Sequence, residues 1–247
     1  MKVLLAAFLL PFSVCALAAN EIDDKVTAAL QAESRPQADR DRDGNRLPLE
    51  TLKFFGLKDN MRVLELIPGG GWYTRVLAPV LAENGEFYVA LGTGRVAENI
   101  AGTPGFGNVQ VLNTSDNMRR PEGSRFYALD EFEFGVSDLD LVLTFRNLHN
   151  FDERSREMMN RQVFKSLASG GLYGVVDHTR RHMEALNNEN RRRLDPVLVI
   201  KEMLDAGFEF VAYSDLHFRA DDELEYEVGR RSVSGNTDRF TLLFRKP

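Results

Sequence analysis

Three short segments of this sequence carry the residue types best suited to chemistry, and each follows an apolar run of strand length. The sequence RVLELIPGGGWYT, residues 62–74, places three consecutive glycines after such a run. The sequences TFRNLHNF, residues 144–151, and VVDHTRRH, residues 175–182, place amide, carboxylate and imidazole groups after two other apolar runs. Glycines let the backbone approach a ligand closely, and imidazoles transfer protons near neutral pH. Together the segments indicate a small-molecule site.

The glycine segment excludes two common ligand classes. Gly69, Gly70 and Gly71 lack a Cβ atom, so the backbone there can turn through positive φ beside a ligand. A phosphate-binding P-loop would continue with Lys and Ser or Thr, but this chain continues with Trp72 and Tyr73. A dinucleotide fingerprint would need a further glycine, where this chain has threonine, and an acid about twenty residues later. The loop therefore fits neither pattern.

The second segment places four polar side chains within five residues at the end of a predicted strand, namely Arg146, Asn147, His149 and Asn150. The two asparagines could be turn formers, and His149 could simply precede a helix. Their position favours function, because loops at strand ends carry binding and catalytic groups. The expected function of His149 is that of a general base, or of a hydrogen-bonding group that orients a substrate.

The third segment places Asp177 and His178 at the end of the next strand, facing the same crevice. Asp177 is suited to orient an imidazole, as carboxylates behind catalytic or metal-bound histidines do. His178 and His182 are four residues apart, a spacing that on a helix would present both to a metal ion. No third ligand is evident, so no metal site is predicted, and surface histidines are the simpler interpretation.

Apolar runs of strand length alternate with helical patterns through most of the chain. This alternation predicts an α/β fold with a doubly wound, mostly parallel sheet, whose ligands bind beyond the carboxyl ends of the strands. The last two strands have no helix between them and should form an antiparallel pair at one edge. The boundaries of helices and strands are least clearly indicated in residues 93–138. The predicted strands are residues 62–67, 87–91, 109–112, 139–145, 172–176, 208–213 and 240–244, and the predicted helices include residues 21–32, 72–83, 153–167 and 197–206.

The strand that precedes the glycines ends with an acid, Glu65, followed by spaced glycines, as in the first motif of S-adenosylmethionine-dependent methyltransferases. Across nearly the whole chain beyond residue 20, the sequence resembles a family of class I methyltransferases that are often exported. The resemblance rests on FFGLKDNMRVLELIPGGGWYTRVLAPVL, DLVLTFRNLHNF, GGLYGVVDHTR and the closing TDRFTLLFRKP. It implies a Rossmann-like, seven-stranded sheet with a C-terminal antiparallel hairpin.

The resemblance also implies a set of site residues. Glu65 would position the amino end of S-adenosylmethionine, and the backbone from Pro68 through Gly69, Gly70 and Gly71 would line the donor. Trp72 and Tyr73 would wall the pocket, although aromatic residues at such a position are also common in a core. Asn147 and His149 would face the reaction centre, with Asp177 and His178 nearby. The acceptor is not specified.

Two departures from the methyltransferase pattern stand out. Ile67 occupies the place of the general motif's first glycine, and no acid directly follows the second strand to bind the ribose hydroxyls; Glu98 is too distant. The chain is also expected to be exported, whereas the methyl donor is made in the cytosol. An alternative is therefore a non-catalytic module of the same fold that binds another small molecule.

The first nineteen residues, MKVLLAAFLLPFSVCALAA, have one lysine, an apolar run and small residues at their end. This pattern predicts an export signal cleaved after Ala18 or Ala19, leaving residues 20–247 as one domain with a helical N-terminal extension over residues 20–60. The destination would be the periplasm if the source is a Gram-negative bacterium. The single cysteine, Cys15, lies within the signal, so no disulfide or cysteine nucleophile is expected after cleavage.

Composition excludes some partners. The formal net charge of −6 gives no indication of nucleic-acid binding. No segment after the signal contains eighteen consecutive apolar residues, so no integral membrane segment is expected.

Two charged motifs have simple interpretations. The sequence DRDRDGNRLPLE, residues 39–50, fits the calcium-loop pattern, but its interspersed arginines and Pro48 disfavour a cation, and a solvated turn is expected. Arg191, Arg192 and Arg193 are expected on a solvated helix face, although an anionic substrate is an alternative.

Overall fold

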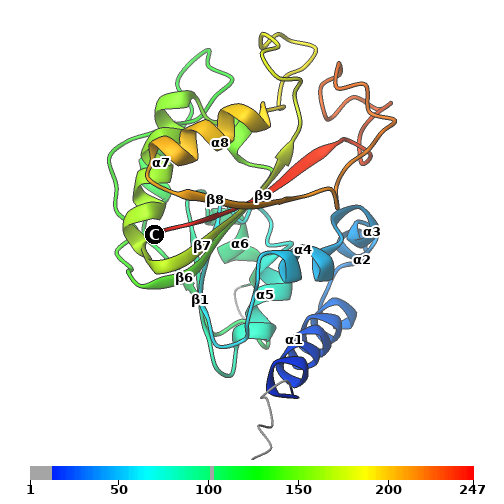
Figure 1. Ribbon diagram of the computed structural model, residues 1–247, viewed down its shortest axis with the longest axis vertical. Coiled ribbons are helices and arrows are strands. Elements are labelled where there is room, and N and C mark those ends of the chain that lie inside the picture. The colour runs from blue at the N-terminus through cyan, green and yellow to red at the C-terminus, as the bar shows by residue number, and fades with distance from the viewer. Residues whose placement is uncertain (1–12, 101–102) are drawn as a thin grey trace, which may run out of the picture.

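The computed structural model of the protein describes residues 13–100 and 103–247 (Figure 1). Seven strands form one sheet in the order β3-β2-β1-β6-β7-β9-β8. The neighbours from β3 to β7 are parallel, and β9 runs antiparallel to both β7 and β8. The strands are β1 (Arg62–Leu66), β2 (Glu86–Ala90), β3 (Val109–Val111), β6 (Leu139–Phe145), β7 (Leu167–His178), β8 (Glu209–Ser214) and β9 (Arg239–Arg245).

Helices cover both faces of the sheet. Figure 1 shows α4 and α5 on one face and α7 and α8 on the other. The helices are α1 (Ser13–Gln31), α2 (Gln37–Arg40), α3 (Asp43–Arg46), α4 (Pro48–Phe54), α5 (Thr74–Leu81), α6 (Gly94–Ile100), α7 (Glu153–Ser166) and α8 (Pro196–Asp205). A small ribbon of β4 (Met118–Arg119) and β5 (Ala128–Leu129) and two 3-10 turns, η1 (Ser115–Asn117) and η2 (Leu148–Asn150), complete the described elements.

Two hydrophobic cores flank the sheet, because successive side chains of a strand point to opposite faces. In β1, Val63 packs with α5 on one face and Leu64 packs toward α7 on the other, and both are fully buried. Strands buried on both faces need near-continuous apolar sequence, which is the pattern that predicted a parallel sheet. Both the predicted fold class and the C-terminal antiparallel hairpin are confirmed.

The boundaries differ from the predictions mainly where the sequence was least readable. Residues 93–138 contain α6, β3, β4, β5 and η1. Strand β7 is longer than expected because it continues from Leu167 through the glycines to His178 and pairs with β6 and β9. Helix α5 begins at Thr74, two residues later than predicted, since Trp72 and Tyr73 still belong to the turn after the glycines.

Residues 39–50 do not form a solvated turn, contrary to expectation. They build the end of α2, all of α3 and the start of α4, and the Arg46 side chain is buried among them. The Asp39 carboxylate accepts a hydrogen bond from Arg75 at 3.1 Å, and the Asp43 carboxylate pairs with the buried Arg35 at 2.7 Å. These acids therefore bind guanidinium groups, and the segment packs over the sheet edge.

Part of the predicted export signal, residues 1–12, lies outside the described residues. The expected cleavage position falls within α1, and the later residues Val26 and Ala29 of this helix are buried in the core shared with α5. In the part of the chain that the structure describes, no helix combines the length and apolarity needed to cross a membrane.

Candidate functional site

The three segments selected from the sequence meet at one edge of the sheet. Strands β1, β6 and β7 are parallel neighbours, so their carboxyl ends lie side by side. Ile67 follows β1 with φ of 53° and Arg146 follows β6 with φ of 62°. A non-glycine residue in this left-handed region costs of order 1–3 kcal/mol, and such strain concentrates at functional sites. The strained turns direct the following residues away from the sheet and leave a crevice.

One side of this crevice is a cavity of about 330 Å³, called here the glycine-loop cavity. Among its lining residues are the predicted donor-site residues Glu65, Pro68, Gly69, Gly70, Trp72, Tyr73 and Asn147. Gly71 does not line it: a Cβ there would lie 2.9 Å from Val96, and its φ is 87°. Gly71 instead allows the turn to pack against α6. The Asn147 side chain donates to the Ile67 carbonyl at 3.1 Å and so ties the β6 end to the glycine loop.

Glu65 is a buried carboxylate at the base of this cavity. It accepts a hydrogen bond from the Thr74 hydroxyl at 2.6 Å and is 3% exposed. Burial raises the pKa of Glu65 to about 7, against a smaller lowering by the Thr74 hydrogen bond and the charge of Arg46. A ligand cation at this position would favour the ionised carboxylate and lower that pKa again.

Trp72 and Tyr73 are both buried in the core and also line the glycine-loop cavity. The Trp72 indole donates to the Asp39 carbonyl at 2.9 Å, and the Arg46 guanidinium lies 4.2 Å from its ring centroid. The Tyr73 ring stacks on Phe145 with centroids 3.5 Å apart. These contacts join the glycine loop to the N-terminal helices and to β6.

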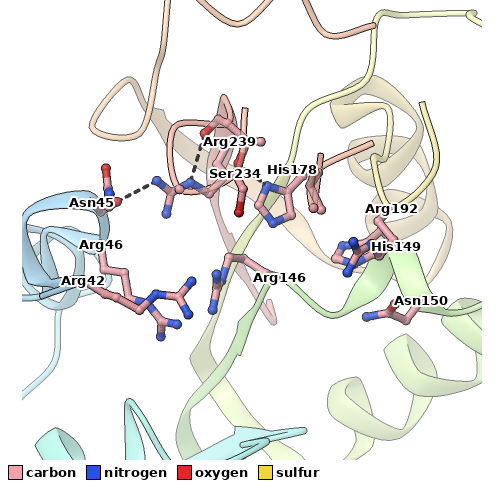
Figure 2. Close-up of a pocket in the computed structure, with 14 residues that line it drawn as sticks. Arg42, Asn45, Arg46, Arg146, His149, Asn150, His178, Arg192, Ser234 and Arg239 are labelled. Carbon is pink, nitrogen blue, oxygen red and sulfur yellow. Dashed lines mark hydrogen bonds between the residues drawn. The ribbon is translucent and has the colours of Figure 1, made fainter. Parts of the chain in front are cut away.

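A second cavity of about 330 Å³, called here the imidazole cavity, adjoins the first. His149, Asn150 and His178 line it, and Figure 2 shows the two histidines with the arginines that surround them. Arg42, Arg46 and Arg146 line both cavities and so form their common wall. The two cavities therefore adjoin at one group of guanidinium ions.

Asp177 holds His149 in place. Its fully buried carboxylate lies 2.5 Å from His149 Nδ1 and accepts the backbone N–H of His149 at 3.0 Å and of His178 at 2.7 Å. With Nδ1 bound to the carboxylate, Nε2 is the nitrogen of His149 that remains for a ligand in the imidazole cavity. The carboxylate thus orients the imidazole of a neighbouring strand end rather than that of adjacent His178.

His178 has a different environment. Its Nδ1 lies 2.9 Å from the Thr237 hydroxyl, and its ring centroid lies 5.5 Å from that of His149. Burial, followed by the nearby charges of His149 and Arg146, holds the pKa of His178 well below its usual value. His178 is therefore neutral at physiological pH and can hydrogen-bond without adding charge.

His178 and His182 do not share a helix face, and the expected surface position is correct for His182 but wrong for His178, which is buried. His178 ends β7, and His182 lies in the following loop, where its Nδ1 is 2.9 Å from the Asp195 carboxylate. Across residues 13–100 and 103–247, no cluster of three or more histidine, cysteine or acidic side chains is arranged to hold a metal ion.

The arginine run at residues 191–193 is also not a solvated helix face. The Arg193 side chain is completely buried and makes two hydrogen bonds of 2.9 Å to the Asp222 carboxylate. Arg192 pairs with Glu227 and lines the imidazole cavity. A buried ion pair across loops that are distant in sequence cannot be read from local charge pattern.

The grouping of arginines around one cavity was not predicted from the sequence. Arg42 and Arg46 come from the segment around α3, Arg146 from the end of β6 and Arg239 from the start of β9. Figure 2 shows the side chains of Arg42, Arg46 and Arg146 directed toward one another. The interspersed arginines of residues 39–50 were the only local signal, and tertiary packing was needed to bring them to Arg146.

Solved structures share this architecture. A SAM-dependent methyltransferase from Aquifex aeolicus matches with a TM-score of 0.59 and 17% identity over 91% of this chain and 98% of its own. The chain has the class I methyltransferase fold. The glycopeptide N-methyltransferase MtfA complexed with sinefungin matches with a TM-score of 0.54 and 15% identity over 83% of this chain and 87% of its own.

The same fold also occurs in a structure described as a cyclase. SpnF matches with a TM-score of 0.56 and 15% identity over 92% of this chain and 94% of its own. No protein-family model matches the sequence, and no curated protein matches it. At these identities the comparisons establish the methyltransferase fold, and the chemistry has to be argued from the site.

The pH dependence of the free energy of unfolding tests whether the Glu65 carboxylate is buried in the folded protein. Its folded-state pKa of about 7 exceeds the ordinary value of 4.5, so between these values the folded chain holds a proton that the unfolded chain has lost. Raising the pH through this window therefore destabilises the folded protein. The side chain introduced by Glu65→Gln does not titrate, whereas all other ionisable groups are present in both proteins. The difference between the two proteins therefore reports Glu65. The free energy of unfolding of the variant minus that of the wild type should rise by on the order of 2 kcal/mol from pH 5 to pH 8 in urea titrations. A difference independent of pH would contradict the buried carboxylate.

Proposed function

We propose that this protein is an S-adenosylmethionine-dependent methyltransferase. The observation that carries the proposal is the pairing of two adjacent cavities at the β1–β6–β7 edge, with the glycine loop in one and the Asp177–His149 pair in the other. A methyl transfer needs a donor and an acceptor aligned across a short gap, and two adjoining cavities that share lining residues are suited to that need.

The glycine-loop cavity fits most of the donor. The Glu65 carboxylate would receive the donor's amino group, and the bare backbone at Gly70 would lie along its amino-acid part. Gly70 lines the cavity, and the side of the loop that a Cβ would occupy faces Asn99, whose Nδ2 donates to the Gly70 carbonyl at 3.0 Å. When bound, the donor supplies a sulfonium-activated methyl group.

The ribose end fits less well. After β2 the chain continues with Leu91, Gly92 and Thr93, and the Thr93 hydroxyl lies 2.8 Å from that of Ser115. No carboxylate is present at this strand end, and Arg95 lines the cavity instead. The Arg95 guanidinium would therefore stand where the usual acid is expected, and this is also the observation that favours the alternative of a non-catalytic module for another small molecule.

His149 would serve as the general base. The donor, held by Glu65 and the glycine loop, would supply its methyl group to the acceptor's lone pair and would leave as the neutral thioether. The acceptor's proton passes to Nε2 of His149. Asp177 keeps the imidazole in the orientation that exposes this nitrogen and stabilises the imidazolium that forms. Asp177 is thus a positioning residue, and His149 touches the acceptor.

Calorimetric titration of residues 20–247 with S-adenosylmethionine, and separately with S-adenosylhomocysteine, tests the donor site. We expect micromolar binding of both, and Gly70→Val should weaken each at least tenfold because its branched side chain would crowd Asn99 and disturb the loop backbone along which the donor would lie. The control is Gly107→Val, where a Cβ meets no atom within 4 Å. No binding at millimolar donor, or equal binding by the two variants, would exclude the methyltransferase and leave the alternative.

His149→Gln tests the base. With donor carrying a tritiated methyl group and a cell-envelope extract as the source of acceptor, label transfer should fall about a hundred- to ten-thousand-fold. Donor affinity should stay unchanged, since His149 does not line the glycine-loop cavity. His182→Gln is the matched control, because this imidazole is 56% exposed and lies outside both cavities. Unchanged label transfer by His149→Gln would remove His149 from the mechanism.

We also propose that the protein is exported and acts on an acceptor of the cell envelope. The composition of residues 1–19 supports this proposal. Intact mass spectrometry of the protein recovered from the periplasm should find a chain that begins at Ala19 or Asn20. A full-length chain confined to the cytoplasm would contradict export.

A further inference from the structure

The imidazole cavity is strongly cationic. Five arginines line it, namely Arg42, Arg46, Arg146, Arg192 and Arg239, and no aspartate or glutamate does. Arg192 is neutralised by Glu227. The remaining four form no ion pair with a carboxylate in the described part of the chain, although ion pairs elsewhere in the molecule are numerous.

Arg46 is the most unusual of the four. It is 6% exposed, and its Nε is buried without a hydrogen-bond partner among the described residues. A buried guanidinium normally has a carboxylate or carbonyl on each donor, because its desolvation is otherwise uncompensated. Arg35 also has a buried Nε without a partner, but its two terminal nitrogens bond to the Asp43 carboxylate, whereas the Arg46 guanidinium makes no hydrogen bond to the described residues. The Arg46 guanidinium is thus available to donate hydrogen bonds to the oxygen atoms of a ligand.

Burial and the positive charges of neighbouring arginines lower the pKa values of two of these side chains. Burial, followed by the charges of Arg146 and Arg42, lowers the pKa of Arg46 to about 9. Burial, followed by the charge of Arg146, lowers the pKa of Arg239 to about 10. An anion among them would relieve this repulsion.

The rest of the lining suits an anion with several oxygens. Ser234 and Thr237 contribute hydroxyl groups, and Gly235 leaves room for close approach of the backbone. Arg239 is fixed from behind by hydrogen bonds to the Asn45 carbonyl at 2.7 Å and the Thr237 carbonyl at 3.3 Å (Figure 2). Guanidinium groups fixed in this way bind phosphate oxygens in pairs.

Charge favours a phosphoryl group over a single carboxylate. Four uncompensated guanidiniums exceed what one carboxylate can neutralise, whereas a phosphate monoester carries close to two negative charges at neutral pH and three terminal oxygens. The proposed donor is itself a sulfonium cation, so a cationic wall beside it would oppose binding unless the acceptor brought negative charge.

From this geometry we infer that the imidazole cavity binds the phosphoryl group of a phosphorylated acceptor, held by Arg42, Arg46, Arg146 and Arg239. The inference rests on the proposed methyl transfer only in calling the ligand an acceptor. The phosphoryl group would anchor the molecule so that its nucleophile lies between His149 Nε2 and the glycine-loop cavity.

Calorimetric titration of residues 20–247 with glycerol 3-phosphate, inorganic phosphate, succinate and glycerol tests the inference. The two phosphates should bind at least tenfold more tightly than succinate, and glycerol should not bind. Arg46→Gln and Arg146→Gln should each weaken phosphate binding at least tenfold. Arg191→Gln is the charge-matched control, since this exposed arginine lines neither cavity.

Thermal unfolding gives an independent readout. Without phosphate, Arg46→Gln should melt at or above the wild-type temperature, because the substitution removes a buried unpaired charge. Phosphate should raise the melting temperature of the wild type and of Arg191→Gln but not of Arg46→Gln. Arg146→Lys keeps the charge without the planar fork and should retain part of the binding, which provides a second variant should Arg46→Gln fail to fold.

The outcomes separate this inference from the proposed function. Phosphate binding that survives Gly70→Val supports the imidazole cavity as its site, whether or not S-adenosylmethionine binds. Donor binding without phosphate binding overturns the inference and leaves the methyltransferase standing. Tighter binding of succinate than of phosphate overturns the phosphoryl assignment in favour of a carboxylate, and loss of phosphate binding in Gly70→Val overturns the location.

Discussion

Both cavities depend on how the chain leaves the sheet at the ends of β1 and β6. These strands are parallel neighbours, but the helix after β1 packs on one face of the sheet and the helix after β6 packs on the other (Figure 1). Connections that depart to opposite faces cannot fill the space between them, and a crevice forms there. The left-handed residues Ile67 and Arg146 mark the two departure points.

Two buried carboxylates in this crevice differ in the number of hydrogen bonds that compensate their charge. On one side Glu65 is buried with a single hydroxyl partner, and on the other Asp177 is buried with three hydrogen bonds to the His149 and His178 segment. The first carboxylate is poorly compensated and so has a raised pKa, whereas the second is well bonded and acts as a fixed orienting group. A poorly compensated acid suits a cationic ligand, and a fixed acid suits the positioning of an imidazole.

The segment around α2 and α3 closes the crevice from the N-terminal side. It brings Arg42 and Arg46 over the strand ends, and the Trp72 indole anchors it through the Asp39 carbonyl. His217 supports it from below, with Nε2 2.9 Å from the Arg46 carbonyl and Nδ1 2.7 Å from the Thr241 hydroxyl. This segment turns a methyltransferase-fold edge into a cationic pocket, and it distinguishes the site from one built by the sheet alone.

Much of the fold was predictable because its signals are local. An apolar run such as that of β1 must be buried on both faces, and its alternation with helical patterns indicates a parallel sheet. The glycines and the polar residues at strand ends were likewise visible, since the carboxyl ends of neighbouring strands must meet. Residues 39–50 were misjudged because their charges look solvated, and only packing against Trp72 and Arg75 shows where they lie.

By itself, the sequence determined the order of strands and helices and the three segments that gather at the sheet edge. Tertiary structure alone decided which imidazole Asp177 orients, that Arg193 is buried against Asp222, and that arginines from four distant segments surround one cavity. The physical reason is that the spacing of apolar residues that specifies a strand or a helix extends over only a few neighbouring residues. It can therefore be read directly from the sequence. The electrostatic environment of a side chain, in contrast, is the sum of charges and burial contributed by residues that approach it only after folding.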